Sequence, residues 1–178
     1  MLSVLQHLKS RHLDIELHKP IVDEHNKIAT FLLYNLSGAI VGYQQYRPNG
    51  EKTKQNDPKA GRYYTHKTHG TVAVFGVETL HLPGPVFVCE GVFDACRISA
   101  NQHAVIAVLS NNPQSDVCNF LHCLGRKIVV IADNDVAGKK LSTLSKHTEY
   151  TTHKDLGESS EEFVQQLLLK HCGHMKNN

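Results

Sequence analysis

Two short runs of β-branched and aromatic residues, each ending on a carboxylate, constrain the fold of this chain more than any other feature. The first run is Val86-Phe-Val-Cys-Glu90-Gly91, and the second, about forty residues later, is Ile128-Val-Val-Ile-Ala-Asp133-Asn-Asp135. A helical pattern follows each run, which is typical of a parallel α/β sheet. In such sheets the carboxyl ends of the strands line the ligand crevice, so we expect Glu90, Asp133 and Asp135 to lie close together there.

The alternation of strands and helices is regular throughout the second half of the chain. Hydrophobic patterning predicts strands at 86–90, 104–109, 127–132 and 149–152, and helices at 92–100, 114–124, 136–147 and 161–169. Ser159, with Glu162 three residues later, predicts a capping box that starts the last helix. The predicted fold class is therefore α/β, a parallel sheet flanked by helices.

The first half of the chain predicts a smaller α+β unit. Helical spacing of apolar residues covers 2–10, and residues 28–34 and 39–47 predict a β-hairpin closed by a turn at 35–38. A polar loop of about twenty residues follows from Pro48, and a short strand and turn are predicted at 71–78. The Pro- and Gly-containing linker at 81–85 predicts a boundary, so we expect domains at 1–84 and 85–178.

Positive charge gathers between residues 44 and 70. Six basic residues lie there against only two acidic ones; the basic residues are Arg47, Lys52, Lys54, Lys59, Arg62 and Lys67. Tyrosines 43, 46, 63 and 64 lie in or near the same stretch. Cations bind phosphates and aromatic rings stack on bases, so this stretch predicts a nucleic-acid strand as partner. The alternative is that the loop is solvated and binds no ligand.

The remaining composition favours an intracellular protein. Of the five cysteines, no two have Cys-x-x-Cys spacing, which favours thiols in a reducing compartment. No apolar run approaches the roughly 20 residues that span a bilayer, so we expect a cytoplasmic protein without a membrane partner. The cluster His171-Cys172-Gly-His174 lacks cysteine partners at suitable spacing, so no structural zinc is expected.

The acids at the strand ends predict metal chemistry. Asp133 and Asp135 are two residues apart where a strand ends, so both side chains point to one side. Two converging carboxylates repel each other and are best neutralised by a hard divalent cation such as Mg²⁺. Gly138, at the start of the next predicted helix, allows close approach of a backbone or a phosphate, and the amino end of that helix favours an anion.

Three further acids are expected near this edge. Glu90 ends the neighbouring strand, and Gly91 after it leaves the carboxylate accessible, so we expect Glu90 to transfer a proton to or from a hydroxyl or water. Asp94 either binds the metal or complements the helix dipole from the first turn. Asp155, after the last predicted strand, is a further candidate metal ligand.

At these residues the sequence resembles the Toprim domain, which bacterial-type primases share with type IA and type II topoisomerases, OLD-family nucleases and small ribosomal-RNA maturation nucleases. The family pattern corresponds here to Glu90-Gly91, Leu109-Ser-Asn111, Asp133-Asn-Asp135-Val-Ala-Gly138 and Lys154-Asp155. The resemblance covers residues 85 to about 170. It implies a Rossmann-like sheet that binds Mg²⁺ or Mn²⁺. Gly157 stands where a second Asp is common in the family, which leaves Glu158 as a substitute.

The part before Pro85 resembles the middle of a primase catalytic core of the kind found in phages and plasmids. The segments that carry this likeness are Tyr34-Asn-Leu-Ser-Gly-Ala-Ile-Val-Gly-Tyr43, Arg62-Tyr-Tyr-Thr-His-Lys67 and Val74-Phe-Gly76. The resemblance implies RNA primer synthesis from nucleoside triphosphates on single-stranded DNA, with Arg62 and Lys67 binding template and nucleotides. It also implies a bacterial, phage or plasmid setting.

Other functions stay open at this stage. The sequence contains neither a cysteine-rich zinc module nor the Gly-x-x-x-x-Gly-Lys-Ser/Thr loop of a helicase, so such partners would act in trans. The first alternative is a Toprim nuclease, in which the same acids activate water to cut DNA or RNA. The second is a non-catalytic nucleic-acid-binding or inhibitory Toprim module.

Overall fold

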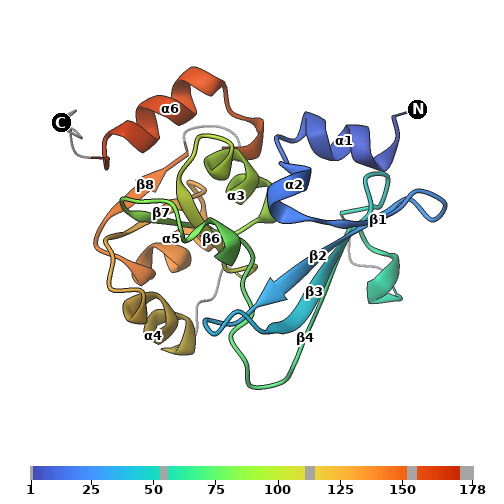
Figure 1. The fold of residues 1–178 in the computed structure, drawn as a ribbon, viewed down its shortest axis with the longest axis horizontal. Helices are drawn as coiled ribbons and strands as arrows, with labels where there is room; N and C mark the ends of the chain where they lie inside the picture. Colours follow the sequence, from blue (N-terminus) through green and yellow to red (C-terminus); the bar gives the residue numbers. More distant parts are fainter. Residues whose placement is uncertain (1, 53–55, 111–114, 152–155, 173–178) are drawn as a thin grey trace.

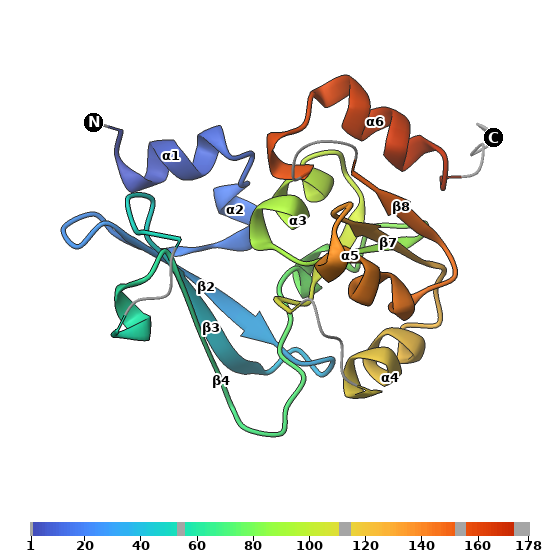
Figure 2. The ribbon, with the colours of Figure 1, turned by 180° about the vertical axis from the view of Figure 1, so that it is seen from behind.

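Two four-stranded sheets, one antiparallel and one parallel, form the framework of the protein (Figure 1). The computed structural model describes residues 2–52, 56–110, 115–151 and 156–172. The antiparallel sheet comes from the first half of the chain and the parallel sheet from the second, with helices on both faces of the parallel sheet (Figures 1 and 2). The α/β class with a parallel sheet flanked by helices, preceded by a smaller α+β part, is confirmed.

The first half begins with two short helices and continues into the antiparallel sheet, whose strand order is β1-β2-β3-β4. Its elements are α1 (Val4–Ser10), α2 (Ile15–His18), β1 (Ile21–Asp23), β2 (Ile28–Tyr34), β3 (Ile40–Tyr46), the 3-10 helix η1 (Pro58–Ala60) and β4 (Tyr63–Lys67). The hairpin and the first helix lie where the sequence predicts them. Along β2, buried residues alternate with half-buried ones, so one face of this sheet packs against the core.

The second half forms the parallel sheet, in the order β6-β5-β7-β8. Its elements are η2 (Val77–Thr79), β5 (Val86–Cys89), α3 (Val92–Ser99), β6 (Ala104–Ala107), α4 (Ser115–Cys123), β7 (Ile128–Ala132), α5 (Val136–Leu141), η3 (Ser142–Leu144), β8 (Thr148–Tyr150), η4 (Leu156–Glu158) and α6 (Glu161–Leu169). The predicted alternation of strands and helices is confirmed, with α5 ending several residues earlier than the predicted helix. No helix in the described part of the chain is long and apolar enough to cross a bilayer.

Alternate residues of the parallel strands pack into two hydrophobic clusters, one on each face of the sheet. Phe87 and Val129 belong to the cluster beneath α3 and α6, whereas Val88 and Val130 belong to the cluster that includes Leu141 of α5. The first cluster also contains buried side chains of α1 and β2, so both halves of the chain share one core. Whether 1–84 and 85–178 fold as separate domains stays a prediction.

Phe31 on β2 connects the antiparallel sheet to the rest of this core. Its ring makes edge contacts with Phe75, at 5.8 Å between centroids, and with Phe93 of α3, at 6.0 Å. A second connection is polar: His18 of α2 hydrogen-bonds Glu78 through Nδ1 and Ser99 Oγ through Nε2, the latter at 2.9 Å. Aromatic packing therefore holds the antiparallel sheet against α3. The buried network holds α2 against α3 and the segment at Glu78.

The segment 71–78, predicted as a short strand and turn, contains only a pair of isolated bridges before its turn. Only Val74 and Phe75 make β-bridges there, to Tyr34 of the antiparallel sheet and to Ala107 of the parallel one. Gly76 then adopts φ +99°, a conformation that side-chain-bearing residues rarely adopt, and a Cβ there would lie 2.4 Å from the Val105 carbonyl oxygen. This turn ends the extended segment and starts η2, so the segment joins the two sheets without forming a strand of its own.

The loop predicted from Pro48 contains a strand that the sequence pattern did not indicate. β4 pairs antiparallel with β3 along its whole length, from Gly42↔Lys67 to Tyr46↔Tyr63. It is an edge strand with four exposed residues out of five, so it lacks the apolar alternation that would have predicted it. The predicted cap of the last helix is also wrong by one residue, since Ser160 and not Ser159 accepts the Phe163 amide.

Removing the ring that connects the two halves should destabilise the whole protein. We expect Phe31→Ala to lower the free energy of unfolding by about 3–5 kcal/mol, because the ring is fully buried and its loss leaves a cavity. Urea unfolding followed by circular dichroism measures the change. Ile21→Ala is the matched control, because Ile21 lies on the same sheet but is 60% exposed; an equal loss in both variants would contradict the role of Phe31.

Candidate active site

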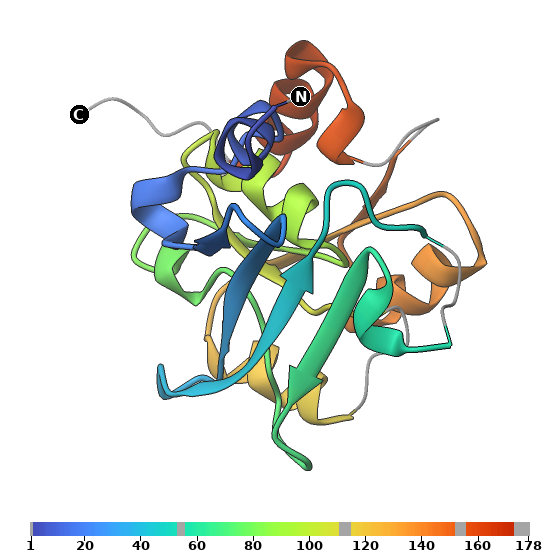
Figure 3. The same cartoon turned by 90° about the vertical axis from the view of Figure 1, so that its right-hand side faces the viewer.

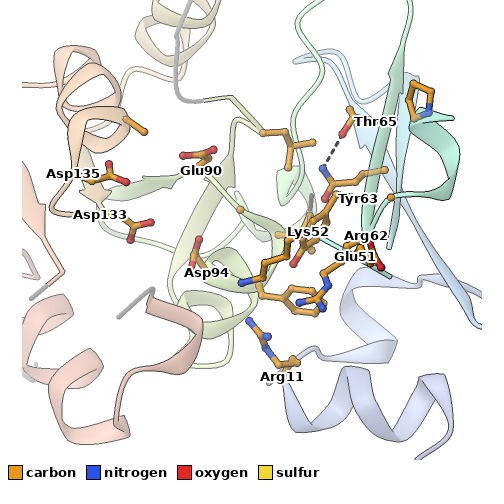
Figure 4. A pocket seen from close by; sticks show the side chains of 18 residues that line it. Arg11, Glu51, Lys52, Arg62, Tyr63, Thr65, Glu90, Asp94, Asp133 and Asp135 are labelled. Carbon is orange, nitrogen blue, oxygen red and sulfur yellow. Dashed lines mark hydrogen bonds between the residues drawn. The ribbon is translucent and has the colours of Figure 1, made fainter. Parts of the chain in front are cut away.

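Pairing of β5 with β7 brings the acids of two strand ends to one edge of the sheet. The two strands are parallel, with Phe87 beside Val129 and Val88 beside Val130. Glu90 follows β5 directly, and Asp133 follows β7. Figure 4 shows the side chains of Glu90, Asp133 and Asp135 on one side of a cleft, with Asp94 beside them. The structure therefore gathers all four described acids named from the sequence, whose chemical roles stay predictions.

Local contacts hold the segment from Asp133 to Gly138 in one conformation. Asp135 is the N-cap of α5, and its Oδ1 accepts a hydrogen bond from the Gly138 amide at 2.7 Å. A Cβ at position 138 would lie only 1.9 Å from the Asp133 carbonyl oxygen, so no larger residue fits without moving the backbone. Thr151, after β8, donates to Asp133 Oδ1 at 3.1 Å. These contacts fix the direction of both carboxylates.

Glu90 lies in an environment that favours its neutral form. Partial burial raises the pKa of Glu90 above its ordinary value, and the negative charges of Asp133 and Asp135 raise it further. A carboxyl group whose pKa is raised toward neutrality is suited to general acid–base catalysis. The carboxylates of Asp133 and Asp135 therefore add to the effect of burial on Glu90.

Asp94 combines a structural contact with exposure to the site. It lies in the first turn of α3, and its Oδ1 accepts a hydrogen bond from the Gly157 amide at 3.0 Å. A Cβ at Gly91 would lie 2.9 Å from Asp94 Oδ2, so glycine at this position leaves room for the carboxylate. Asp94 therefore ties the segment after β8 to α3 and also lines the cleft.

Basic and aromatic residues form the opposite wall of the cleft. The cleft has a volume of about 770 Å³ and lies between the carboxylates and the antiparallel sheet (Figure 4). Arg11, Lys52 and Arg62 line it together with Tyr63 of β4. Arg62 is held by a hydrogen bond from its Nε to the Gly50 carbonyl at 2.7 Å. One wall is thus acidic, and the other carries three cations and one acid, Glu51, an arrangement that suits a phosphate-containing ligand with a bridging cation.

Tyr63 and its neighbours add polar groups to the basic wall. Tyr63 is 45% exposed, and the ordinary pKa of tyrosine, about 10, keeps its hydroxyl protonated and a donor at neutral pH. Gln44 and Thr65 also line the cleft and are joined by a hydrogen bond of 2.8 Å (Figure 4). The wall therefore offers hydrogen-bonding groups as well as cations.

Arg11 is the residue of this wall that the sequence did not indicate. It is the C-cap of α1, and its guanidinium carbon lies 4.5 Å from the centroid of the Phe93 ring. The sequence predicted α1 as an amphipathic helix without a functional residue, and no local pattern distinguishes Arg11 from other basic residues. Only the packing of α1 against α3 places this cation opposite the carboxylates.

Other predicted residues lie elsewhere. Lys67 is at the far end of β4 and is not among the described residues that line the cleft. Gly138 lines a small cavity behind the carboxylates, together with Thr151. Lys54 and Asp155 lie outside the described residues, so their predicted roles stay untested.

The donor set fits a hard divalent cation. Mg²⁺ is usually bound through one or two carboxylates, and waters and substrate phosphates complete its coordination. Asp133 and Asp135 supply two such carboxylates at the edge of the parallel sheet. Their charges also raise the pKa of Glu90. Within the described part of the chain, no three His, Cys, Asp or Glu side chains are close enough to hold a metal by themselves. A metal here would take its remaining ligands from water and substrate.

Comparison with solved structures places the fold among the catalytic cores of DNA primases. The primase of Aquifex aeolicus, in a structure of its zinc-binding and RNA polymerase domains, aligns with a TM-score of 0.61 at 17% identity, over 88% of this chain and 44% of that one. A DnaG primase catalytic domain bound to single-stranded DNA aligns with a TM-score of 0.58 at 14% identity, over 85% of this chain and 59% of the other.

A phage protein gives a similar result. The primase fragment of the bacteriophage T7 primase-helicase aligns with a TM-score of 0.59 at 14% identity, over 92% of this chain and 72% of that fragment. This chain thus spans about half the length of the first bacterial cores that it matches. No protein-family model and no curated protein sequence matches it. The fold is that of primase catalytic cores, and the Toprim name for residues 85–178 stays a prediction.

The crowding of the carboxylates should be measurable as a pH-dependent cost in stability. Because the pKa of Glu90 is raised in the folded protein, its ionised form opposes folding. We expect Glu90→Gln to raise the free energy of unfolding at slightly alkaline pH in the presence of EDTA. The gain should vanish as the pH falls below the ordinary pKa of glutamate, where the carboxyl is protonated in both states.

The control for this measurement is a glutamate with the opposite shift. Hydrogen bonds from the Val4 and Leu5 amides lower the pKa of Glu24. We therefore expect Glu24→Gln to lower the free energy of unfolding at neutral pH, with the loss disappearing in acid. Urea unfolding across a pH series measures both variants; a Glu90→Gln protein that is less stable than the parent at alkaline pH would contradict the electrostatic account.

Proposed function

We propose that this chain catalyses metal-dependent nucleotidyl transfer on nucleic acid, and that it synthesises RNA primers on single-stranded DNA as primases do. The observation that supports this best is a single cleft with a carboxylate wall facing a cationic wall, on the fold of primase catalytic cores. The order of Glu90-Gly91 and Asp133-Asn-Asp135-Val-Ala-Gly138 at the strand ends supports a Toprim assignment. The substrates proposed are nucleoside triphosphates and a single-stranded DNA template.

The proposal assigns different roles to different residues of the cleft. Asp133 and Asp135 would hold Mg²⁺ or Mn²⁺, which supplies Lewis-acid stabilisation of charge on the phosphates when bound. Glu90, with its raised pKa, accepts the proton of the attacking 3′-hydroxyl. The 3′-oxygen forms a bond to the α-phosphorus, the bond from that phosphorus to the bridging oxygen breaks, and pyrophosphate leaves. Arg11, Lys52 and Arg62 bind phosphate oxygens from the opposite wall.

The proposal extends to partners and setting. Bacteriophage T7 provides a solved neighbour whose primase fragment belongs to a primase-helicase protein, and the Aquifex neighbour includes a zinc-binding domain. We propose that a helicase or a zinc-module protein assists this chain in trans. The setting proposed is the cytoplasm of a bacterial cell, with a phage or plasmid as the source of the gene.

Primer synthesis tests the proposal directly. Labelled ribonucleotides should be incorporated on single-stranded DNA templates with Mg²⁺ or Mn²⁺ and not with EDTA. We expect Glu90→Gln to lower the rate by about 10²–10⁴-fold, the range for loss of a general base. Asp133→Asn should abolish metal-dependent incorporation.

Asp116→Asn is the control, because Asp116 is an exposed acid on α4, away from the cleft. No incorporation by the parent protein, or full activity of Glu90→Gln, would contradict the proposal. Metal-dependent cleavage of DNA or RNA without incorporation, lost in Asp133→Asn, would replace it with a nuclease. Salt-dependent DNA binding that neither metal nor Asp133→Asn affects, without either activity, would indicate a non-catalytic module.

The role of Arg11 is tested by a substitution that keeps its packing. Methionine retains an apolar stem over the Phe93 ring while removing the charge. We expect Arg11→Met to raise the KM for nucleotide about tenfold or more, since a hydrogen bond to a charged group contributes about 1.5–3 kcal/mol. Lys9→Met on the exposed side of α1 is the control. An unchanged KM for Arg11→Met would remove Arg11 from the binding wall.

A further inference from the structure

The antiparallel sheet has a second face, which points away from the cleft. On β3 and β4, Tyr43 lies opposite His66, and Gln45 lies opposite Tyr64. Because side chains alternate along a strand, these four lie on the face opposite to Gln44 and Thr65, which line the cleft. The same two strands therefore present one face to the candidate active site and the other face outward.

The rings on this outer face contact one another. The centroid of the Tyr43 ring lies 6.3 Å from that of Tyr64 and 5.3 Å from that of His66. The Lys59 ammonium from η1 lies 5.9 Å from the centroid of the Tyr64 ring. Arg47, just after β3, donates a hydrogen bond from Nη2 to Gln45 Oε1. Cations thus approach the edge of an aromatic cluster.

None of the described helices covers this face. Figure 3 looks onto the antiparallel sheet, and the parallel sheet with its helices lies behind it. Tyr43 and Tyr64 are half-buried and His66 is exposed, so ring surface remains accessible to solvent. Three rings and two cations in one patch fit a ligand that combines flat apolar surfaces with negative charge. Single-stranded nucleic acid has both in every residue.

We propose that the outer face of β3 and β4 binds single-stranded nucleic acid, with bases stacked on Tyr43 and Tyr64 and phosphates near Lys59 and Arg47. This is a second binding surface, separate from the cleft. It does not depend on which reaction the carboxylates support, because stacking and phosphate contacts need neither metal nor nucleotide.

The position of β4 connects the proposed surface to the cleft. β4 is an edge strand, and Gly61, Arg62 and Tyr63 at its beginning line the cleft. A single-stranded nucleic acid bound on the outer face could therefore pass around β4 and reach the basic wall of the cleft within a few nucleotides. The outer face would hold one part of the strand while another part lies opposite the carboxylates.

Binding of a fluorescein-labelled thymidine oligonucleotide, measured by anisotropy in EDTA without nucleotides, tests the proposal. We expect Tyr64→Ala and Tyr43→Ala each to weaken binding about fivefold or more, the range for loss of one stacked base. Tyr64→Phe keeps the ring and should bind like the parent. Lys59→Glu, at an exposed position, should weaken binding and reduce its salt dependence.

Tyr150→Ala is the matched control, because Tyr150 is an exposed tyrosine on β8 of the other sheet. Thermal unfolding of each variant identifies any that fail to fold, and Lys59→Glu then carries the test. The proposal would be overturned if folded Tyr64→Ala and Lys59→Glu both bound the oligonucleotide with the affinity of the parent. It would also be overturned if Tyr64→Phe lost as much affinity as Tyr64→Ala. A concentration-dependent dimer that Tyr64→Ala abolishes, with DNA binding unchanged, would assign the face to a second copy of the chain instead.

The test separates this proposal from the proposed reaction. Asp116→Asn, at an exposed position on α4 away from the cleft, should bind the oligonucleotide like the parent. If primer synthesis fails while the tyrosine variants still weaken binding, the surface stands and the proposed reaction falls. If synthesis succeeds while the tyrosine variants bind normally, the reaction stands and the surface falls.

Discussion

Parallel pairing of β5 with β7 is the constraint on which the candidate site depends. Because the two strands are neighbours and run in the same direction, the residues that follow them must emerge at the same edge. Three carboxylates line that edge, and burial raises the pKa of Glu90, with a further rise from the charges of Asp133 and Asp135. A folded protein carries such a cost where function requires it, since no packing advantage comes from gathering like charges.

The rest of the molecule supports this edge from two directions. Behind it, Gly138 lets α5 begin against the Asp133 carbonyl, and Thr151 from β8 hydrogen-bonds the Asp133 carboxylate. In front of it, the cationic wall comes from Arg11 at the end of α1 and from Lys52 and Arg62 between β3 and β4. The shared core around Phe31 fixes the antiparallel sheet in place. Apolar packing therefore sets the distance between the two walls of the cleft, whereas the charged side chains on those walls determine what the cleft can bind.

The sequence predicted well what depends on local patterns. Short apolar strands alternating with helical patterns predicted the parallel sheet, and the carboxylates after its strands could be named from their positions alone. Its errors lie where local pattern and tertiary structure diverge. β4 is an exposed edge strand without apolar alternation, and Val74 and Phe75 are extended only because each bridges a different sheet. The two bridges depend on partners more than thirty residues away in sequence.

The sequence by itself therefore determined the α/β class, the order of the parallel-sheet strands along the chain and the identity of the acids at their ends. Local propensity and a fixed chain order are sufficient for these features. Only the tertiary structure decided that Arg11 faces those acids, that Tyr63 belongs to the cleft, and that Tyr43 and Tyr64 lie on the opposite face of the same sheet. The reason is physical: these positions follow from strand register and from packing between distant segments, which no short stretch of sequence encodes.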